Sequence, residues 1–204
     1  MKINEEIVEA FKKSINEESS DRAKVIISVA QIEYLFDLKL KEFYSHGNTK
    51  AREKLFSEDG AFSTFSSKVN IAFCSGWIDP DVYHDIEHLR KIRNYFAHSS
   101  ENLTMDSPII RKCIENFIVP HREYSDWGKI KAVALDDGFI LYTGEKPEEG
   151  NEQLIVPGNL FFGLSISIIY GVLLENLGIK IELKNGKIID IELTEHMKLD
   201  KEAT

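Results

Sequence analysis

At 204 residues the chain has the length of one ordinary domain, and its 43% hydrophobic content is enough for a buried core. The formal net charge of −9 gives the whole molecule a field that repels nucleic acid and anionic membranes. Direct DNA binding is therefore expected to be weak or absent, because cations cluster noticeably only at Arg90, Lys91 and Arg93. Cys74 and Cys113 stand alone without a C-x-x-C pair, which suits a reducing cytoplasm and no structural zinc.

The first part of the chain predicts two amphipathic helices. In the first helix, apolar residues recur at helical spacing at Ile3, Ile7, Phe11 and Ile15. Ser20 is placed to cap a second, longer helix that ends near residues 46–47. The apolar seam of the second helix consists of Val25, Val29, Ile32, Phe36, Leu40 and Phe43. Glu33 lies beside this seam, and Asp37 lies further round the helix.

Two more helices are predicted before residue 77. A short one covers residues 49–56, and Ser63 or Thr64 can begin the next, which Gly76 ends. The apolar positions of that helix are Phe65, Val69, Ala72 and Phe73.

Residues 84–99, HDIEHLRKIRNYFAHS, are the centre of the sequence, and the helix that contains them begins at Asp79-Pro80-Asp81. At 100° per residue, one face of this helix carries Val82, Ile86, Leu89 and Phe96. Arg93 lies in the middle of that face, and a guanidinium among core residues must be paired because it cannot lose its proton. We predict that its partner is Glu33 of the second helix, an ion pair that would be structural.

A different face of the same helix carries polar and aromatic side chains. These are His84, His88, Lys91 and Tyr95. We expect this face to be an interface with a partner subunit.

A further cap-and-proline start, Asp106-Ser107-Pro108, predicts a helix that Pro120 closes. Its inward residues are Ile109, Ile110, Cys113 and Phe117.

The character of the chain then changes, and two β-hairpins are predicted. One covers residues 129–143 with a turn at Asp136-Asp137-Gly138, and the other covers residues 179–193 around Asn185-Gly186. Between them, residues 160–174 are uncharged but shorter than the roughly 20 residues that cross a bilayer, so we expect a buried helix at about 159–177. Because isolated hairpins are unstable in water, we expect both to form one antiparallel sheet packed on the helices.

The expected fold is therefore mainly α, a helical bundle with a small C-terminal antiparallel β-sheet of two hairpins. Residues 1–120 would form the bundle. Residues 121–204 would contribute the first hairpin, the returning helix and the second hairpin, all within one globular unit.

Three stretches carry a resemblance to a known family. They are DRAKVIIS (21–28), GAFSTFSSKVNIAF (60–73) and YHDIEHLRKIRNYFAH (83–98). In these stretches the sequence resembles the mannitol operon repressor (MltR) family. The resemblance covers most of residues 20–118 and implies a mainly helical protein that controls transcription through protein contacts. The hairpins depart from what the family implies.

The segment RNYFAH also resembles the Arg-polar-x-x-x-His signature of HEPN domains, helical bundles that often dimerise. Some of them are metal-independent ribonucleases. That resemblance implies that His98 acts as a general acid or base, that Arg93 holds the scissile phosphate, and that Asn94 orients one of the two. On an unbroken helix, residues five apart diverge by about 140°, so Arg93 and His98 converge only if the helix breaks or two subunits contribute.

A metal or nucleotide cofactor is not expected. His84-x-x-Glu87-His88 matches the inverted zinc-protease pattern, but zinc needs a third ligand that the pattern does not supply. The sequence contains no G-x-G-x-x-G or P-loop, and no serine or cysteine within a nucleophile motif.

Two functional hypotheses therefore remain open. The first is a cytoplasmic, homodimeric regulator of the MltR type that binds an unknown protein partner. The alternative is a HEPN-type endoribonuclease that cuts RNA with Arg93 and His98.

Overall fold

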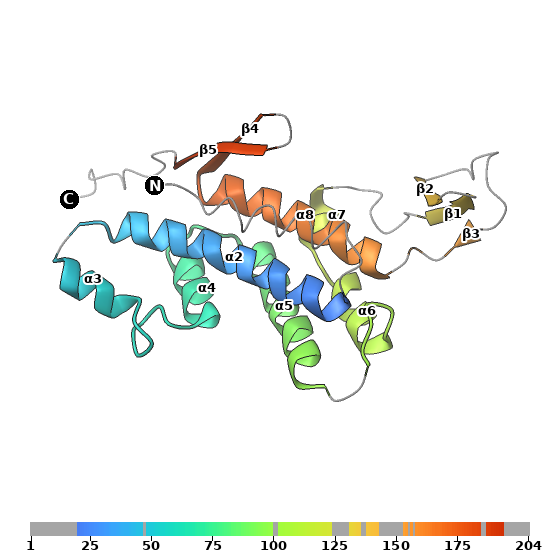
Figure 1. The fold of residues 1–204 in the computed structure, drawn as a ribbon, viewed down its shortest axis with the longest axis horizontal. Coiled ribbons are helices and arrows are strands. Elements are labelled where there is room, and N and C mark those ends of the chain that lie inside the picture. Colours follow the sequence, from blue (N-terminus) through green and yellow to red (C-terminus); the bar gives the residue numbers. More distant parts are fainter. Residues whose placement is uncertain are drawn as a thin grey trace.

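The computed structural model describes residues 20–46, 48–99, 102–123, 131–135, 138–142, 153–154, 156, 158–184 and 187–193. The helix expected around Ile3–Ile15 lies outside these residues. Within them the protein is mainly helical, and long helices cross one another around a common core (Figure 1).

The first described helix, α2 (Asp21–Phe43), begins where the sequence predicts, because the Ser20 side chain accepts a hydrogen bond from the Ala23 amide. The predicted seam from Val25 to Leu40 is buried, with each of its five residues at most 5% exposed. Phe43 is the exception: it is 48% exposed and its ring lies 5.0 Å from that of Trp77.

Two shorter helices follow α2 and complete this side of the bundle. Helix α3 (Thr49–Leu55) is capped by Asn48, and α4 (Phe65–Cys74) begins after Thr64, whose hydroxyl accepts from the Ser67 amide. Helix α4 packs on α2 and ends before Gly76, whose φ of 70° is the left-handed conformation that favours glycine.

The central helix α5 (Pro80–His98) is continuous and begins at the predicted cap, where Asp79 accepts from the Val82 amide at 2.8 Å. Helix α6 (Pro108–Glu115) also begins at its predicted proline. Pro120 does not close α6, which ends five residues earlier, at Glu115. It lies instead in the first turn of a short helix, α7 (Val119–Glu123). Backbone N–H groups in the first turn make no hydrogen bond within the helix, so a proline, which has no N–H, is tolerated there.

Helix α8 (Gly158–Asn176) is the returning helix. It is long and apolar enough to cross a membrane by length and composition alone. One face is packed into the bundle, where Phe162, Ile166, Ile169 and Leu173 are at most 2% exposed. This buried face accounts for part of the apolar composition of α8, because a helix packed into a core needs apolar residues on the side it buries.

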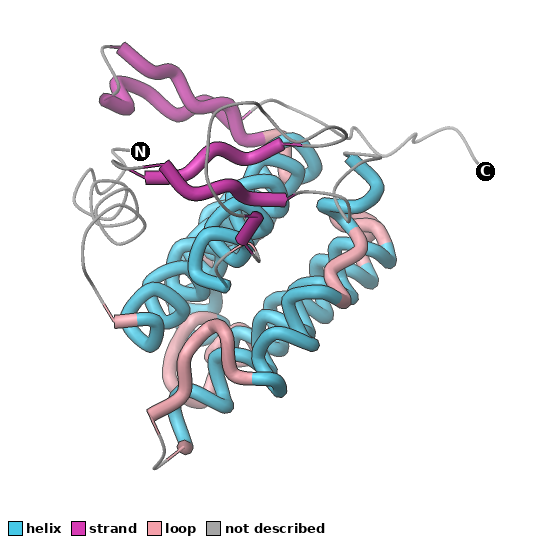
Figure 2. Tube along the Cα trace, turned by 90° about the vertical axis from the view of Figure 1, so that its right-hand side faces the viewer, coloured by secondary structure: helices cyan, strands magenta, loops and turns pink. Residues whose placement is uncertain are grey.

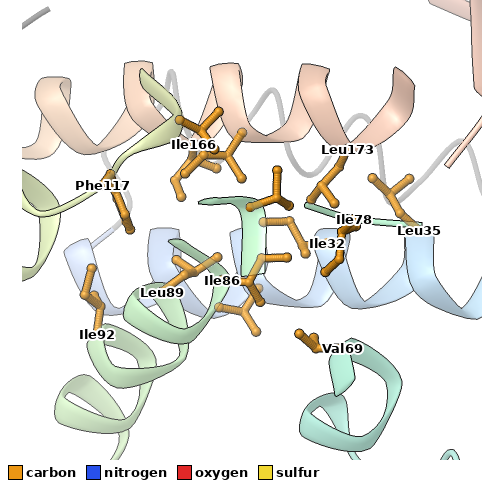
Figure 3. Packing of buried hydrophobic residues seen from close by; sticks show 14 of the residues in the cluster. Ile32, Leu35, Val69, Ile78, Ile86, Leu89, Ile92, Phe117, Ile166 and Leu173 are labelled. Atoms are coloured by element: carbon orange, nitrogen blue, oxygen red, sulfur yellow. The ribbon is translucent and has the colours of Figure 1, made fainter. Parts of the chain in front are cut away.

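Residues of α2, α5, α6 and α8 that are far apart in the sequence form one hydrophobic cluster. Figure 3 shows α8 and α2 on either side of this core, with Ile32 and Leu35 from α2, Ile86 and Leu89 from α5, and Ile166 and Leu173 from α8. The core is thus completed by a helix that comes more than a hundred residues after the one it covers.

The strands pair as two hairpins but not as one sheet. Strands β1 (Lys131–Leu135) and β2 (Gly138–Tyr142) are antiparallel, and β3 (Gln153–Leu154) adds to β1, giving the order β2-β1-β3. Strands β4 (Ile179–Lys184) and β5 (Lys187–Leu193) form a separate antiparallel pair with a bulge between Glu182 and Leu183.

The prediction of a single C-terminal sheet is therefore wrong. Figure 1 shows β4 and β5 at the C-terminal end of α8 and the other sheet beyond its N-terminal end. A helix of 19 residues is about 28 Å long, so it holds the two hairpins apart. Figure 2, which looks onto the end of the molecule that carries β1 and β2, also shows the two pairs of strands apart.

Candidate functional site

The three residues of the Arg-Asn-x-x-x-His signature lie in the last two turns of α5. Arg93 and His98 are exposed, and Asn94 is partly exposed. The Arg93 Nη1 donates a hydrogen bond to Asn94 Oδ1 at 3.3 Å. Helix α5 is unbroken through His98, so Arg93 and His98 diverge around its axis and one chain does not bring them together.

The expected ion pair between Glu33 and Arg93 is not formed. Glu33 pairs instead with Lys68 of α4, at 2.6 Å between Nζ and Oε1. Asp37 Oδ1 lies 2.8 Å from the same Nζ, although that contact does not have hydrogen-bond geometry. Lys68 is only 6% exposed, and the two carboxylates outweigh its burial, so its pKa is raised.

Arg93 is exposed because α4, which packs on the N-terminal part of α5, does not extend over it, while Ile92 and Phe96 on another side of α5 stay buried. The side-chain contacts between α4 and α5 lie at Tyr83, whose hydroxyl donates to Asn70 and whose ring stacks on Phe73. Arg93 is ten residues further on, about 15 Å along the axis. Helical spacing predicts the direction in which a side chain points from its helix, but it does not predict whether a neighbouring helix covers that side chain.

The His84 face of α5 is accessible, and its two histidines are ordered by hydrogen bonds. His84 Nδ1 lies 3.0 Å from Asp85 Oδ1, and His88 Nδ1 lies 3.1 Å from the His84 carbonyl oxygen. The two ring centroids are 4.2 Å apart. Lys91 and Tyr95 continue the face, and both are exposed.

Asp85 is a structural residue that the sequence interpretation missed. Its carboxylate is 0% exposed and accepts hydrogen bonds from the amides of Ile118 and Val119, at 2.7 and 2.8 Å. Burial raises its pKa even though these bonds and His84 favour the charged form. Its position in the sequence could have predicted this burial. Asp85 is three residues after Val82 and four before Leu89, so it lies on the same face of the helix as these core residues.

The inverted zinc-protease pattern does not assemble. The Glu87 carboxylate is bound by Arg90 through both Nε and Nη2, so it is engaged away from the histidines. Among the residues that the structure describes, no three His, Cys, Asp or Glu side chains are grouped to hold a metal ion.

The Cys113 thiol is not activated as a nucleophile. Burial raises the pKa of the Cys113 thiol, although Lys91 and Lys112 act in the opposite direction. A thiol with a raised pKa is protonated at neutral pH and is a poor nucleophile.

Lys91 and Lys112 lie on two helices that contact each other, and both lysines act on the Cys113 thiol, so we group the accessible and partly accessible residues around them as the α5–α6 surface. It comprises His84, His88, Lys91 and Tyr95 of α5, and Ile109 and Lys112 of α6. Tyr95 is 39% exposed and Ile109 is 45% exposed, so the surface offers apolar contact area beside its two lysines.

Comparison with known proteins gives a fold but not a sequence family. No protein-family model and no curated protein matches the chain. Among solved structures, the MtlR–HPr complex from Escherichia coli matches with a TM-score of 0.56 at 14% identity, covering 84% of this chain and 97% of the other. YggD, a possible transcriptional regulator from Shigella flexneri, matches with a TM-score of 0.58 at 13% identity, covering 86% and 99%.

The chain has an MltR-like fold. The matches span nearly the full length of both neighbours, and because they cover 84% and 86% of this chain they extend beyond residue 120. At these identities the likeness establishes the arrangement of the helices and leaves the binding residues to be argued from this chain itself.

Proposed function

We propose that this protein is a regulator of transcription that acts by binding another protein and not by reading DNA directly. The observation that carries the proposal is the match with two solved proteins along almost their whole length. One of them is described as a possible transcriptional regulator, and the other was solved in complex with HPr.

The α5–α6 surface is our candidate for the protein contact. Tyr95 and Ile109 supply apolar area, and tyrosine is among the residues enriched where binding energy concentrates. Lys91 and Lys112 lie on the same surface of a molecule whose net charge is −9. We therefore expect the partner to present a complementary acidic patch next to an apolar one.

Direct DNA reading is disfavoured by the same charge balance. Protein–DNA affinity depends on lysine and arginine contacts with phosphate, and a molecule of net charge −9 opposes them at long range. We expect any DNA binding to be weak and to fall steeply as salt is raised. We further propose that the protein is cytoplasmic. We also propose that it is a homodimer, which light scattering of the purified chain would test.

A binding experiment tests the proposal. The HPr protein of the source cell is titrated against the full chain, and the same titration is made with Lys91→Glu and Tyr95→Ala. Each variant is expected to weaken binding at least about tenfold, since reversing or removing an interface anchor costs about 1–3 kcal/mol. Lys54→Glu, at an exposed lysine of α3, is the matched control and should leave affinity unchanged.

Two results would count against the proposal. One is binding of the protein to HPr or to cellular proteins that is insensitive to Lys91→Glu and Tyr95→Ala. The other is sequence-specific DNA binding that survives physiological salt in the absence of any other protein.

RNA cleavage is our second candidate function, because Arg93, Asn94 and His98 are accessible and the Arg93–Asn94 bond already orders two of them. The proposal requires a second subunit to bring His98 of one chain to Arg93 of the other. The purified protein would then cut single-stranded RNA in EDTA, and His98→Ala would abolish cutting without changing thermal stability. Absence of cleavage by the wild-type dimer would eliminate this candidate.

A further inference from the structure

The two neighbouring histidines of α5 have defined protonation patterns. The groups that face their Nδ1 atoms, the Asp85 carboxylate and the His84 carbonyl oxygen, are both acceptors. Each Nδ1 must therefore carry the hydrogen and donate it. A neutral imidazole has only one N–H, so the lone pair of each ring is on Nε2.

The His84 ring is held in place by a buried carboxylate. Asp85 is itself fixed by two backbone amides and is 0% exposed, so it cannot turn away from the ring. A carboxylate that accepts from Nδ1 of a histidine whose Nε2 is free is the arrangement found behind metal-binding histidines, where it fixes the tautomer and makes the ring a better donor. The His84 side chain is 38% exposed, so its ring remains accessible.

The spacing of the two rings also fits one shared ion. With metal–nitrogen distances of about 2.1 Å, two imidazoles bound to one ion have ring centroids about 4.6 Å apart at a right angle and about 5.3 Å apart at the tetrahedral angle. The His84 and His88 centroids are 4.2 Å apart, so a small rotation about the side-chain bonds is enough. Residues one helical turn apart lie on the same face, which gives both rings the same approach.

We propose that His84 and His88 form an open, two-histidine site for a borderline transition-metal cation such as Zn²⁺, Ni²⁺ or Cu²⁺, bound through both Nε2 atoms. Asp85 is the positioning residue for His84. The described residues supply no third ligand, so water completes the coordination of the free protein. Imidazole ligands disfavour Mg²⁺ and Ca²⁺, which prefer oxygen.

The test uses the full chain without an affinity tag. Cu²⁺ and Zn²⁺ are titrated by calorimetry in a non-coordinating buffer, and the Cu²⁺ complex is examined by electron paramagnetic resonance, which counts the bound nitrogens. We expect one ion per chain with two imidazole nitrogens, and tighter binding of Cu²⁺ than of Zn²⁺, the order that nitrogen ligands give. His84→Ala and His88→Ala should each weaken binding at least about tenfold and remove one nitrogen from the spectrum.

His98→Ala is the matched control, because His98 is an exposed histidine of the same helix and should not contribute. Asp85→Asn should weaken binding by about 10–100-fold while keeping both nitrogens, provided that its circular dichroism shows an intact fold. The proposal is overturned if neither His84→Ala nor His88→Ala changes the affinity. It is equally overturned if His98→Ala lowers the affinity as much as they do, or if the spectrum shows fewer than two nitrogens.

Discussion

At the scale of single residues, two buried charged groups hold elements of the bundle together, and each connects positions that are far apart in the sequence. Lys68 joins α4 to α2 through Glu33 and Asp37. Asp85 joins the middle of α5 to the turn that begins α7.

Replacing Lys68 by methionine should destabilise the protein. The change leaves Glu33 and Asp37, which are 31% and 24% exposed, facing each other without a cation. Removing one partner of a fully buried pair costs about 3–5 kcal/mol, and partial exposure of the carboxylates reduces that to about 2 kcal/mol. Urea unfolding measures the loss, Lys54→Met on exposed α3 is the control, and adding Glu33→Gln should restore part of the stability. A Lys68→Met protein as stable as wild type would contradict this role.

Asp85 should give the protein a specific pH dependence. Its pKa in the folded state is raised above the usual value of 3.8, so the folded protein holds the proton more tightly than the unfolded chain does. The cost of burying the ionised group is therefore absent below pH 3.8 and grows as pH rises through the folded-state pKa. Below this window Asp85 is protonated in both states, and above it Asp85 is ionised in both.

The comparison with Asp85→Asn isolates this effect. At pH 7 the variant should be less stable by about 1–3 kcal/mol, because an amide oxygen replaces only one of the two acceptors for the Ile118 and Val119 amides. The difference in the free energy of unfolding between wild type and Asp85→Asn should increase as the pH is lowered toward 4. Only wild type becomes more stable there, because only its residue 85 can take up a proton. Exposed Asp59→Asn should show no such widening in urea unfolding at the same pH values. A gap that narrows in acid would mean that hydrogen bonds outweigh burial at Asp85.

At the scale of elements, two glycines of α8 provide a matched pair. A Cβ on Gly158 would lie 2.6 Å from the backbone of Met105, whereas one on Gly171 would meet nothing within 4 Å. Gly158→Ala should therefore destabilise the protein by about 1–3 kcal/mol, because the backbone contact cannot yield. Gly171→Ala should stabilise it by about 0.5–1 kcal/mol through higher helix propensity. Thermal melts of the two variants should shift in opposite directions, and equal shifts would refute the close contact.

Several helix starts were predictable from the sequence, because a helix cap depends only on residues within a few positions of it. Ser20, Thr64 and Asp79 cap their helices as expected, each through a bond to an amide three residues on. Pro120 was misread because proline both follows a helix and begins one, and only the capping carboxylate of Asp85, 35 residues earlier, selects the second role.

The candidate site was less predictable, because part of it depends on contacts between residues that are far apart in the sequence. The sequence placed His84, His88, Lys91 and Tyr95 on one accessible face, because that depends on helical spacing alone. It paired Arg93 with Glu33 wrongly, because the partner depends on how α2, α4 and α5 cross. Lys68, the residue that binds Glu33, lies in an apolar stretch of α4 where its long side chain gave no sign of being buried.

At the scale of the whole molecule, the two hairpins are separate appendages on a common helical body. Each sheet has its own hydrogen bonds, and α8 lies between them. They should therefore open independently, unlike two hairpins of one sheet.

Ile181→Pro tests this independence. Ile181 pairs with Ile191 in the β4–β5 hairpin, and proline removes its backbone N–H. Hydrogen exchange should become faster across residues 179–193 while β1 and β2 keep their wild-type rates. Faster exchange in both hairpins would show that they are coupled.

The late position of α8 has a consequence for how the protein is made. Its buried face covers α2, and Val29 and Ile169 of the same core are separated by 140 positions along the chain. At a synthesis rate of about 5–20 residues per second, the ribosome needs roughly 7–28 s to extend the chain from one to the other. During that interval the apolar seam of α2 has only part of its cover. The nascent chain is therefore expected to need a chaperone until its last helix emerges, and slow codons placed before that helix should increase aggregation in the cell.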